Sequence, residues 1–393
     1  MNQISLLHVV GDSRYGGGVQ IIFPLAVRAR RAGWKVDILT TDPIWQQSIR
    51  ESEKGVGIVP LDVIHRPIRP LWDLRGMRRL TNYLREHPYT IVHTHTSKAG
   101  LVGRMAATVA NVPVVVHTAH GFAFHEQSSR AARWLYSSIE RYAADCCDAV
   151  VCVSRFHRQW ALELGIGTPE RIVAIPNGLP PERAKATRSR AEMRAELQLG
   201  NDELMLFSAG RMAPQKGFEY LIRAIPFLAR ALTRPFRVIL AGEGDLREPL
   251  EQLARQVGAE QHLQFLGFRN DVTNLWAASD IVVLPSLWEG LSISLLEAMA
   301  AAKPIVTTRI GSNYEVVAHE ETALLVEPAN VEQLTAAILR CADDPELCQS
   351  LGRRAAELYR SQYTYDRMLE DYMNLYERAL ATKQLGVRYA RAS

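Results

Sequence analysis

The chain lacks the features that mark several large classes of protein. None of its apolar runs reaches the roughly 18 residues that a membrane-spanning helix needs. The N-terminus has no basic start and reads directly as a strand, so we expect no signal peptide. The five cysteines are odd in number and form no CxxC pair, which indicates a reduced, cytoplasmic protein without a disulfide framework.

Two nucleotide-binding fingerprints are also missing. The predicted turn after the first strand, Val10–Gln20, holds three consecutive glycines but no GxGxxG pattern, and the chain has no P-loop ending in Gly-Lys-Ser or Gly-Lys-Thr. Gly17 and Gly18 can still let the backbone approach a ligand closely. The same glycines are equally compatible with a tight turn that serves only packing.

The histidines are concentrated in the first half of the chain. Nine of the eleven lie in residues 1–180, and His93 and His95 alternate on a predicted strand. Imidazole is a good zinc ligand, but no acidic or thiol residue stands at ligand spacing, so we expect no metal. His120, at the end of the next strand, is the best placed to line a cleft. Its imidazole could steer a nucleophile or bind a sugar, or it could be packed in the core.

Length and pattern predict two α/β domains. A chain of 393 residues exceeds one ordinary core, and predicted strands and helices alternate throughout. The stretch Ile175–Pro181 is rich in proline and glycine, so we expect two doubly wound, Rossmann-like domains over 1–180 and 181–363, facing a central cleft. Segment 364–393 is expected to form a helix that packs back toward the first domain, with a tail after about Lys383.

Charge is unevenly distributed along the chain. The net charge is +4, but residues 1–180 hold 21 Lys or Arg against 14 Asp or Glu, and the excess concentrates in His65–Arg79. A basic segment beside an anionic leaflet gains roughly 1 kcal/mol per Lys or Arg. The segment therefore predicts either peripheral contact with an anionic membrane or an ordinary solvated helix face. No nucleic-acid partner is expected.

The most informative segment is Pro285–Ala300. It follows an apolar strand and leads into a helix, with Glu289 in the loop and Glu297 within the helix. Free N–H groups at a helix N-terminus form an anion site. Two carboxylates beside such a site suit a ligand with hydroxyls at both ends and phosphate between them, which is the layout of a nucleotide-sugar. Both glutamates could instead be acids on the helix surface.

A second loop supplies two cations. Arg211 and Lys216 follow the first predicted strand of the second domain. Arginine offers a planar fork and lysine a point charge, so the pair suits a diphosphate, whereas the alternative is two surface cations on a loop. The turns at Gly244 and at Phe268 and Arg269 end the next two strands. Each could touch a base or a phosphate, although each is more readily a plain turn.

Together these motifs resemble those of family-four retaining glycosyltransferases of the GT-B fold, and the resemblance covers nearly the whole chain, roughly Ile4 to Leu380. The glycine turn, the pair His120-Gly121, the arginine–lysine loop and the paired glutamates occur in the order that the family has. The resemblance implies an enzyme without metal or other cofactor, in which Arg211 and Lys216 hold the donor diphosphate. It also implies that Glu297 holds the ribose and that His120 lines the reaction centre.

The resemblance further implies a grip on the donor sugar by Glu289 and by backbone groups of Gly290, Leu291 and Ser292. The remaining donor contacts that it implies are Gly17, Gly18, Gly244, Phe268 and Arg269. The chain departs from the family at Ser312, where a second glycine is usual, and in the polar run 291–294. Both departures fall in the expected donor-sugar pocket and leave the identity of the donor sugar open.

We therefore expect a cytoplasmic hexosyltransferase, peripheral on the inner face of the cell membrane, that serves bacterial surface or exopolysaccharide synthesis. Its donor would be a nucleotide diphosphate sugar, a UDP-sugar rather than a GDP-sugar. Its acceptor would be a glycan, polyprenyl-linked, and transfer would retain the anomeric configuration. Two alternatives remain open, a nucleotide-sugar epimerase of the same tandem fold and a non-catalytic nucleotide-sugar-binding protein.

Overall fold

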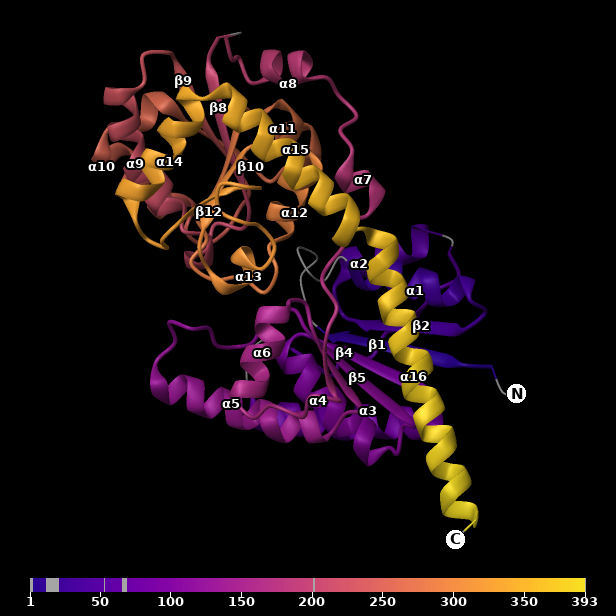
Figure 1. Cartoon of the computed structure of the whole chain (residues 1–393). Helices are drawn as coiled ribbons and strands as arrows, with labels where there is room; N and C mark the ends of the chain where they lie inside the picture. The colour runs from indigo at the N-terminus through magenta and orange to yellow at the C-terminus, as the bar shows by residue number, and fades with distance from the viewer. Residues whose placement is uncertain (1–2, 12–20, 53, 66–68, 201, 393) are drawn as a thin grey trace. The chain divides into compact units, whose positions relative to one another are not determined.

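The computed structural model describes residues 3–11, 21–52, 54–65, 69–200 and 202–392, the side chains of 384–392 excepted. The chain divides into two compact units, one formed by 1–177 with 366–393 and the other by 178–365. Each unit is a parallel sheet flanked by helices, and this confirms the predicted α/β class of two Rossmann-like domains (Figure 1). Among the described residues, no helix is both long enough and apolar enough to cross a membrane.

The first unit contains a seven-stranded sheet in the order β3-β2-β1-β4-β5-β6-β7. Its strands are β1 (Ser5–Gly11), β2 (Lys35–Thr40), β3 (Gly57–Val59), β4 (Ile91–His95), β5 (Val114–Ala119), β6 (Ala149–Cys152) and β7 (Ile172–Ala174). Its helices are α1 (Ile22–Arg31), α2 (Pro43–Glu51), α3 (Pro70–Glu86), α4 (Ser97–Val109), α5 (Arg130–Asp145), α6 (Arg155–Glu163) and α16 (Tyr365–Ala392).

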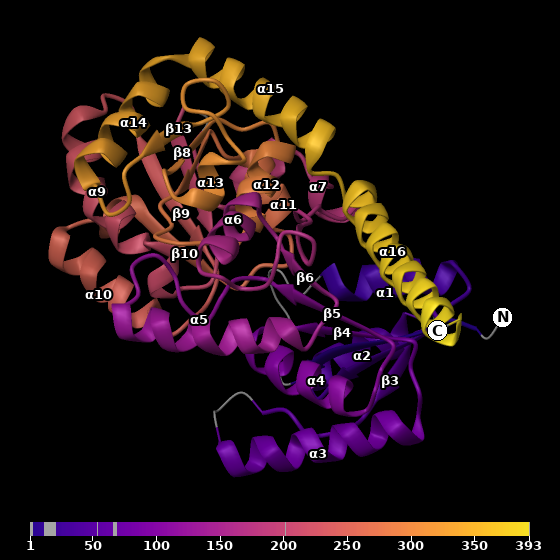
Figure 2. The same ribbon diagram turned by 60° about the horizontal axis from the view of Figure 1, so that its bottom comes forward.

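The two faces of this sheet differ in polarity. Helices α3 and α4 lie on one face, while α1 and α16 lie on the other (Figure 2). Side chains alternate along a strand, so Leu7 and Val92 enter the apolar core under α3 and α4, whereas His8 and His93 point to the opposite face. There, Tyr376 of α16 makes a hydrogen bond of 2.5 Å to Nδ1 of His93.

The second unit contains a six-stranded sheet in the order β10-β9-β8-β11-β12-β13. Its strands are β8 (Leu204–Ala209), β9 (Phe236–Ala241), β10 (Leu263–Gly267), β11 (Ile281–Leu284), β12 (Ile305–Thr308) and β13 (Leu324–Val326). Its α-helices are α7 (Pro181–Ala184), α8 (Arg190–Glu196), α9 (Phe218–Ala231), α10 (Arg247–Val257), α11 (Val272–Ala278), α12 (Ile293–Ala300), α13 (Gly311–Tyr314), α14 (Val331–Asp343) and α15 (Pro345–Gln362), with 3₁₀ turns at Pro214–Lys216 and Glu260–His262.

The C-terminal helix belongs to the first unit although it follows the second in sequence. Helix α16 begins at Tyr365 and buries Met368, Leu369, Tyr372 and Tyr376, which are spaced three or four residues apart and so share one face. The helix continues to Ala392, past Lys383.

Candidate functional site

Three loops of the second unit meet at the carboxyl edge of its sheet, after the neighbouring strands β9, β8 and β11. Gly244 packs closely on the loop after β8, because a Cβ there would lie 2.4 Å from the carbonyl oxygen of Met212. Gly217 has a φ of +60° and faces the end of β11, where a Cβ would lie 2.1 Å from the carbonyl oxygen of Pro285. Only glycine fits at these two positions, because any side chain would clash with the facing carbonyl oxygen. The two glycines therefore allow the loops that carry the predicted motifs to pack against one another.

Glu289 is the centre of this arrangement. One carboxylate oxygen accepts hydrogen bonds from Nζ of Lys216 at 2.6 Å and from Oγ of Ser286 at 2.9 Å. The other accepts from Nε2 of Gln215 at 2.7 Å. Glu289 is 8% exposed, so its charge is stabilised by Lys216 and by the two neutral donors rather than by water.

The cluster retains binding capacity for a ligand. An ammonium group has three N–H donors, and Glu289 takes one of those of Lys216. A carboxylate has about four acceptor positions, and three of those on Glu289 are occupied. Lys216 can therefore donate to an anionic oxygen while Glu289 accepts one more hydroxyl.

The N-terminus of α12 adds free backbone donors beside Glu289. Ser292 caps the helix, its Oγ accepting from the N–H of Leu295 at 3.3 Å. Among the residues that the structure describes, none accepts a hydrogen bond from the backbone N–H of Gly290, Leu291 or Ser292. These donors and the helix dipole favour a negatively charged or hydroxyl oxygen at this position.

Glu297 lies inside α12 and is almost fully enclosed. Its Oε1 accepts from Arg183 at 2.5 and 2.8 Å, and its Oε2 accepts from Nε1 of Trp276 at 3.2 Å. Burial raises the pKa of this carboxyl, and the Arg183 guanidinium opposes that rise. The carboxylate of Glu297 is thus held by two partners and has about one acceptor position left.

The other predicted donor contacts of this unit differ in their surroundings. Arg211 is exposed, and in the described part of the chain its guanidinium has no hydrogen-bond or ion-pair partner. Phe268 is 72% exposed just after β10. Arg269 is engaged within the protein, with hydrogen bonds of 2.7 Å to Asp271 and an ion pair of 2.8 Å to Glu196. The guanidinium of Arg269 can contact a nucleotide base only if it retains its ion pairs with Asp271 and Glu196 or gives them up.

His120 belongs to the first unit and follows β5. Its Nε2 lies 3.3 Å from Nδ1 of His95, and burial lowers its pKa to about 4, so the imidazole is neutral at neutral pH. Gly17 and Gly18, predicted to face donor phosphate or acceptor, lie outside the described residues.

Comparison with known proteins agrees with this geometry. Residues 16–178 match the glycosyl transferase 4-like domain, and residues 189–358 match glycosyl transferases group 1. The chain is 32% identical over 285 residues to UDP-Gal:alpha-D-GlcNAc-diphosphoundecaprenol alpha-1,3-galactosyltransferase of Escherichia coli, covering 72% of this chain and 74% of that protein. This chain belongs to the family-four glycosyltransferases of the GT-B fold.

Solved structures share the fold of this glycosyltransferase. The structure of Anabaena HepE in complex with UDP-glucose matches with a TM-score of 0.81 at 21% identity, covering 96% of this chain and all of that one, 100%. WaaG, a glycosyltransferase involved in lipopolysaccharide biosynthesis, matches with a TM-score of 0.75 at 21% identity, covering 95% of this chain and 99% of that one.

The two departures of this glycosyltransferase from the family pattern have different surroundings. Ser292 caps α12, and Oγ of Ser294 donates to the carbonyl oxygen of Ala209, at the end of β8, at 2.9 Å. Both hydroxyls of the polar run after Gly290 are therefore bonded to backbone groups of the second unit. Ser312 is buried, and among the described residues its hydroxyl has no partner. Ser312 therefore keeps a hydrogen-bonding group that a glycine would lack.

Sequence reasoning missed four residues that hold the two glutamates of the glycosyltransferase. Gln215 and Ser286 could have been found from the sequence, because Gln215 precedes Lys216 and Ser286 lies three residues before Glu289. Both residues therefore lie in the two loops that carry the predicted motifs. Arg183 and Trp276 stand 114 and 21 residues from Glu297. Nothing in their local sequence signals this contact, since it depends on how distant helices pack.

Proposed function

We propose that this glycosyltransferase transfers a hexose from a UDP-sugar to a polyprenyl-linked glycan, with retention of configuration and without a metal. The observation that supports it best is the cluster around Glu289, in which Lys216, Gln215 and Ser286 converge beside the free N–H groups of α12. This cluster offers a cation, an acceptor carboxylate and backbone donors within one strand-end site.

In the proposed complex the diphosphate occupies the loop after β8. Lys216 donates to its oxygens through the N–H groups that Glu289 leaves free, and the exposed Arg211 adds a bidentate contact. The sugar hydroxyls meet Glu289 and the N–H groups of Gly290 to Ser292. Glu297 accepts from the ribose at its remaining position, and the uracil lies near Phe268.

In the proposed reaction the anomeric carbon loses its bond to the diphosphate and gains one to the acceptor oxygen on the same face of the sugar. The electron pair of the broken bond moves to the leaving phosphate, which takes the proton of the acceptor hydroxyl. Arg211 and Lys216 stabilise the charge that develops on that phosphate, as fixed donors do where charge appears in a transition state. These two cations do the work that a metal would otherwise do.

The proposed acceptor is lipid-linked, which places the enzyme on the inner face of the membrane in surface or exopolysaccharide synthesis. The E. coli relative is named for a sugar carried on diphosphoundecaprenol. In the present chain, Leu71 and Trp72 of α3 are 83% and 58% exposed. The arginines of the same helix are Arg75, Arg78, Arg79 and Arg85. Exposed apolar side chains beside arginines suit an anionic bilayer surface.

Replacement of Arg211 tests the proposed transfer reaction. We expect Arg211→Ala to lower transfer about 100- to 1,000-fold with an unchanged fold, the usual cost of losing one such donor. Arg255→Ala, on an exposed helix position of the same unit, is the matched control and should keep normal turnover. The assay follows nucleoside diphosphate release with a donor panel, with and without membrane extract as the acceptor source.

Near-normal turnover of Arg211→Ala would contradict the proposed role of the arginine. Release of UDP without acceptor, together with an epimerised sugar, would indicate the epimerase alternative. Donor binding with no turnover across the panel would indicate a binding protein.

Vesicle flotation tests the proposed membrane contact. We expect binding to anionic vesicles that weakens at high salt and weakens further in Trp72→Ser. Phe227→Ser replaces an exposed aromatic residue of the second unit and should bind as the wild type does. Absence of vesicle binding at low salt would remove the membrane contact from the proposal.

A further inference from the structure

Gln215 is held in the strand-end site of the second unit from two directions. It belongs to the 3₁₀ turn Pro214–Lys216. Its backbone carbonyl accepts from the N–H of Leu287 at 2.8 Å, and its Nε2 donates to Oε2 of Glu289 at 2.7 Å. Both partners lie in the loop after β11. A side chain that is fixed at its backbone and at its tip presents its remaining polar groups in a defined direction.

The contact with Glu289 decides which way round the Gln215 amide lies. The two ends of a glutamine amide are nearly equal in shape, so the hydrogen-bond partners show which end is oxygen and which is nitrogen. Glu289 is a carboxylate paired with Lys216, and a carboxylate only accepts hydrogen bonds. The NH₂ group of Gln215 must therefore face Glu289, and the amide oxygen of Gln215 faces away from it.

The amide oxygen of Gln215 is open to a ligand. Among the residues that the structure describes, none donates a hydrogen bond to this oxygen. The oxygen is not one of the unpartnered atoms that the protein encloses, and Gln215 as a whole is partly exposed. Gln215 thus offers an unused acceptor that solvent can reach, and a ligand can reach it in the same way.

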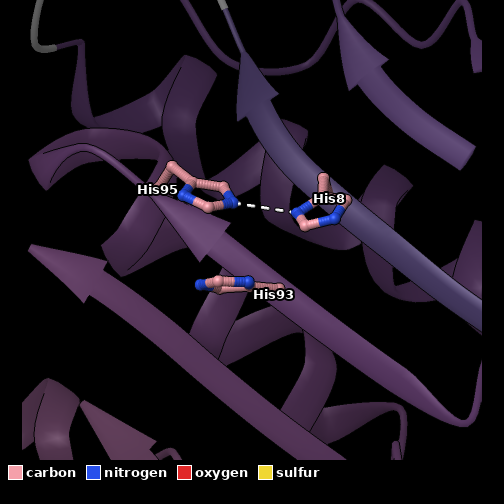
Figure 3. Close-up of side chains that lie close together, drawn as sticks. All are labelled: His8, His93 and His95. Atoms are coloured by element: carbon pink, nitrogen blue, oxygen red, sulfur yellow. Dashed lines mark hydrogen bonds between the residues drawn. The ribbon is translucent and has the colours of Figure 1, made fainter. Parts of the chain in front are cut away.

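An unpartnered atom of the first unit differs in this respect. Figure 3 shows His8, His93 and His95, where Nδ1 of His8 lies 3.0 Å from Nε2 of His95. Nε2 of His8 has no partner among the described residues, but it is enclosed by protein. A ligand cannot reach that nitrogen in this structure, whereas it can reach the amide oxygen of Gln215.

The last acceptor position of Glu289 lies beside Gln215. One carboxylate oxygen, Oε1, already accepts from Lys216 at 2.6 Å and from Ser286 at 2.9 Å. The other, Oε2, accepts only from Gln215 among the described residues. A carboxylate oxygen has about two acceptor positions, so a ligand hydroxyl that donates to Glu289 must bind Oε2. Gln215 holds this same oxygen.

Two unused acceptors therefore stand next to each other, one on Glu289 and one on the amide of Gln215. Donors to one carboxylate oxygen diverge along its two lone pairs, so a hydroxyl bound to Glu289 lies beside the amide without occupying it. Two neighbouring acceptors need two neighbouring donors. Hydroxyls on adjacent carbons of a sugar ring supply such a pair, because each carries one O–H.

We propose that Gln215 is a specificity-determining residue, whose amide oxygen accepts a hydrogen bond from the donor-sugar hydroxyl adjacent to the one that Glu289 binds. The substrate class that follows is a nucleotide-linked hexose with two free neighbouring hydroxyls at this place. A sugar that lacks either hydroxyl leaves an acceptor unpaired, and sites built to bind a hydroxyl reject such analogues. The inference rests on the proposed function, in which the sugar hydroxyls meet Glu289.

Calorimetric binding of monodeoxy donors tests this assignment without any turnover. The probes are UDP-glucose and UDP-galactose, each compared with its 2-, 3-, 4- and 6-deoxy forms. In the wild type, loss of the hydroxyl bound to the neutral Gln215 should raise Kd about 3- to 10-fold. Loss of the hydroxyl bound to the charged Glu289 should raise Kd about 10- to 100-fold, because hydrogen bonds to charged groups are stronger.

Two variants assign the two hydroxyls. Gln215→Met keeps the length of the side chain and removes the amide, so the smaller penalty should vanish at one position of the sugar. Glu289→Gln should reduce the larger penalty at a neighbouring position. Gln256→Met, at an exposed position of α10, is the matched control and should keep both penalties.

Loss of the same penalty in both variants would overturn the proposal, because Gln215 would then only hold Glu289 in place. Unchanged penalties in a folded Gln215→Met, or effects of the two variants at positions that are not adjacent, would overturn it too. If that variant does not fold, the wild type still decides, since a panel without two adjacent penalised positions contradicts the proposal. The expected pattern in an enzyme that transfers no sugar would uphold the role of Gln215 and count against the proposed transfer instead.

Discussion

The two units differ in the polar groups that they bury, although the first also encloses the ion pair Arg104–Glu140. The first keeps neutral imidazoles in its interior, with His8, His93, His95 and His117 almost completely enclosed. The second buries carboxylates and pairs each with a cation, as in Lys216–Glu289 and Arg183–Glu297. A neutral ring needs only hydrogen bonds when it is buried, whereas a buried charge needs a partner of opposite sign.

Titratable groups of the two units also give them different pH windows for stability. A buried histidine with a lowered pKa stays neutral while its unfolded counterpart binds a proton, so the first unit loses stability as the pH falls below 6.5. In the second unit, Arg269 lowers the pKa of Asp271 below its usual 3.8, so the stability of that pair is lost only at lower pH. The histidine-rich unit should therefore be the first to respond to mild acid.

Mild acidification should have the largest effect. Between pH 6.5 and about pH 5, each buried histidine with a lowered pKa should reduce the stability of the first unit by about 1.4 kcal/mol per pH unit. These histidines are His8, His93, His95, His117 and His120. Hydrogen exchange followed by mass spectrometry, with labelling times scaled for pH, should show loss of protection in 1–177 while 178–365 stays protected.

The second unit provides the internal control, because it has only two histidines, His262 and His319. If both units lost hydrogen-exchange protection together above pH 5, the buried histidines would not explain the predicted difference in acid stability between them.

Breaking the buried ion pair of the first unit should have the next largest effect. Arg104 and Glu140 are 2.9 Å apart, and the arginine is 0% exposed. Arg104→Met leaves Glu140 buried without its partner, which typically costs about 3–5 kcal/mol. Urea denaturation should detect this, and the double variant Arg104→Met/Glu140→Leu should recover most of the loss. A single variant as stable as the wild type would show that water reaches Glu140.

The matching change in the second unit should cost less. In Arg183–Glu297 the arginine is 31% exposed, against 0% for Arg104. Glu297→Gln therefore leaves a cation that water can solvate, and we expect a loss of about 1–3 kcal/mol. Glu140→Gln, measured beside it by urea denaturation, should lose more. Equal losses would mean that exposure of the arginine does not govern the cost of breaking these pairs.

Much of the fold follows from local pattern. Apolar runs such as 112–116 predict strands buried on both faces, and the alternation of strands with helices predicts parallel sheets. The apolar spacing in α16 likewise predicts a helix with one buried face. Local pattern does not supply the individual residues that this face contacts, because the contact between Tyr376 and His93 joins residues 283 positions apart.

The candidate site was predictable in part for the same reason. Arg211, Lys216 and Glu289 each follow a strand in a parallel sheet, so their placement at one edge could be expected. The direct ion pair between Lys216 and Glu289 could not be expected, since it depends on how the loops after β8 and β11 pack. Arg269 was predicted as a donor contact, but in the structure it pairs with Glu196 and Asp271 of its own unit. Its local sequence showed no sign of these two ion pairs.

The sequence by itself determined which side chains are available and at which strand ends they stand, because hydrophobic period and turn residues act over a few positions. Only the tertiary structure decided which of them meet. The register of β1 beside β4 and β4 beside β5 brings His8, His95 and His120 into one chain, and hydrogen bonds operate over about 3 Å whatever the distance along the sequence.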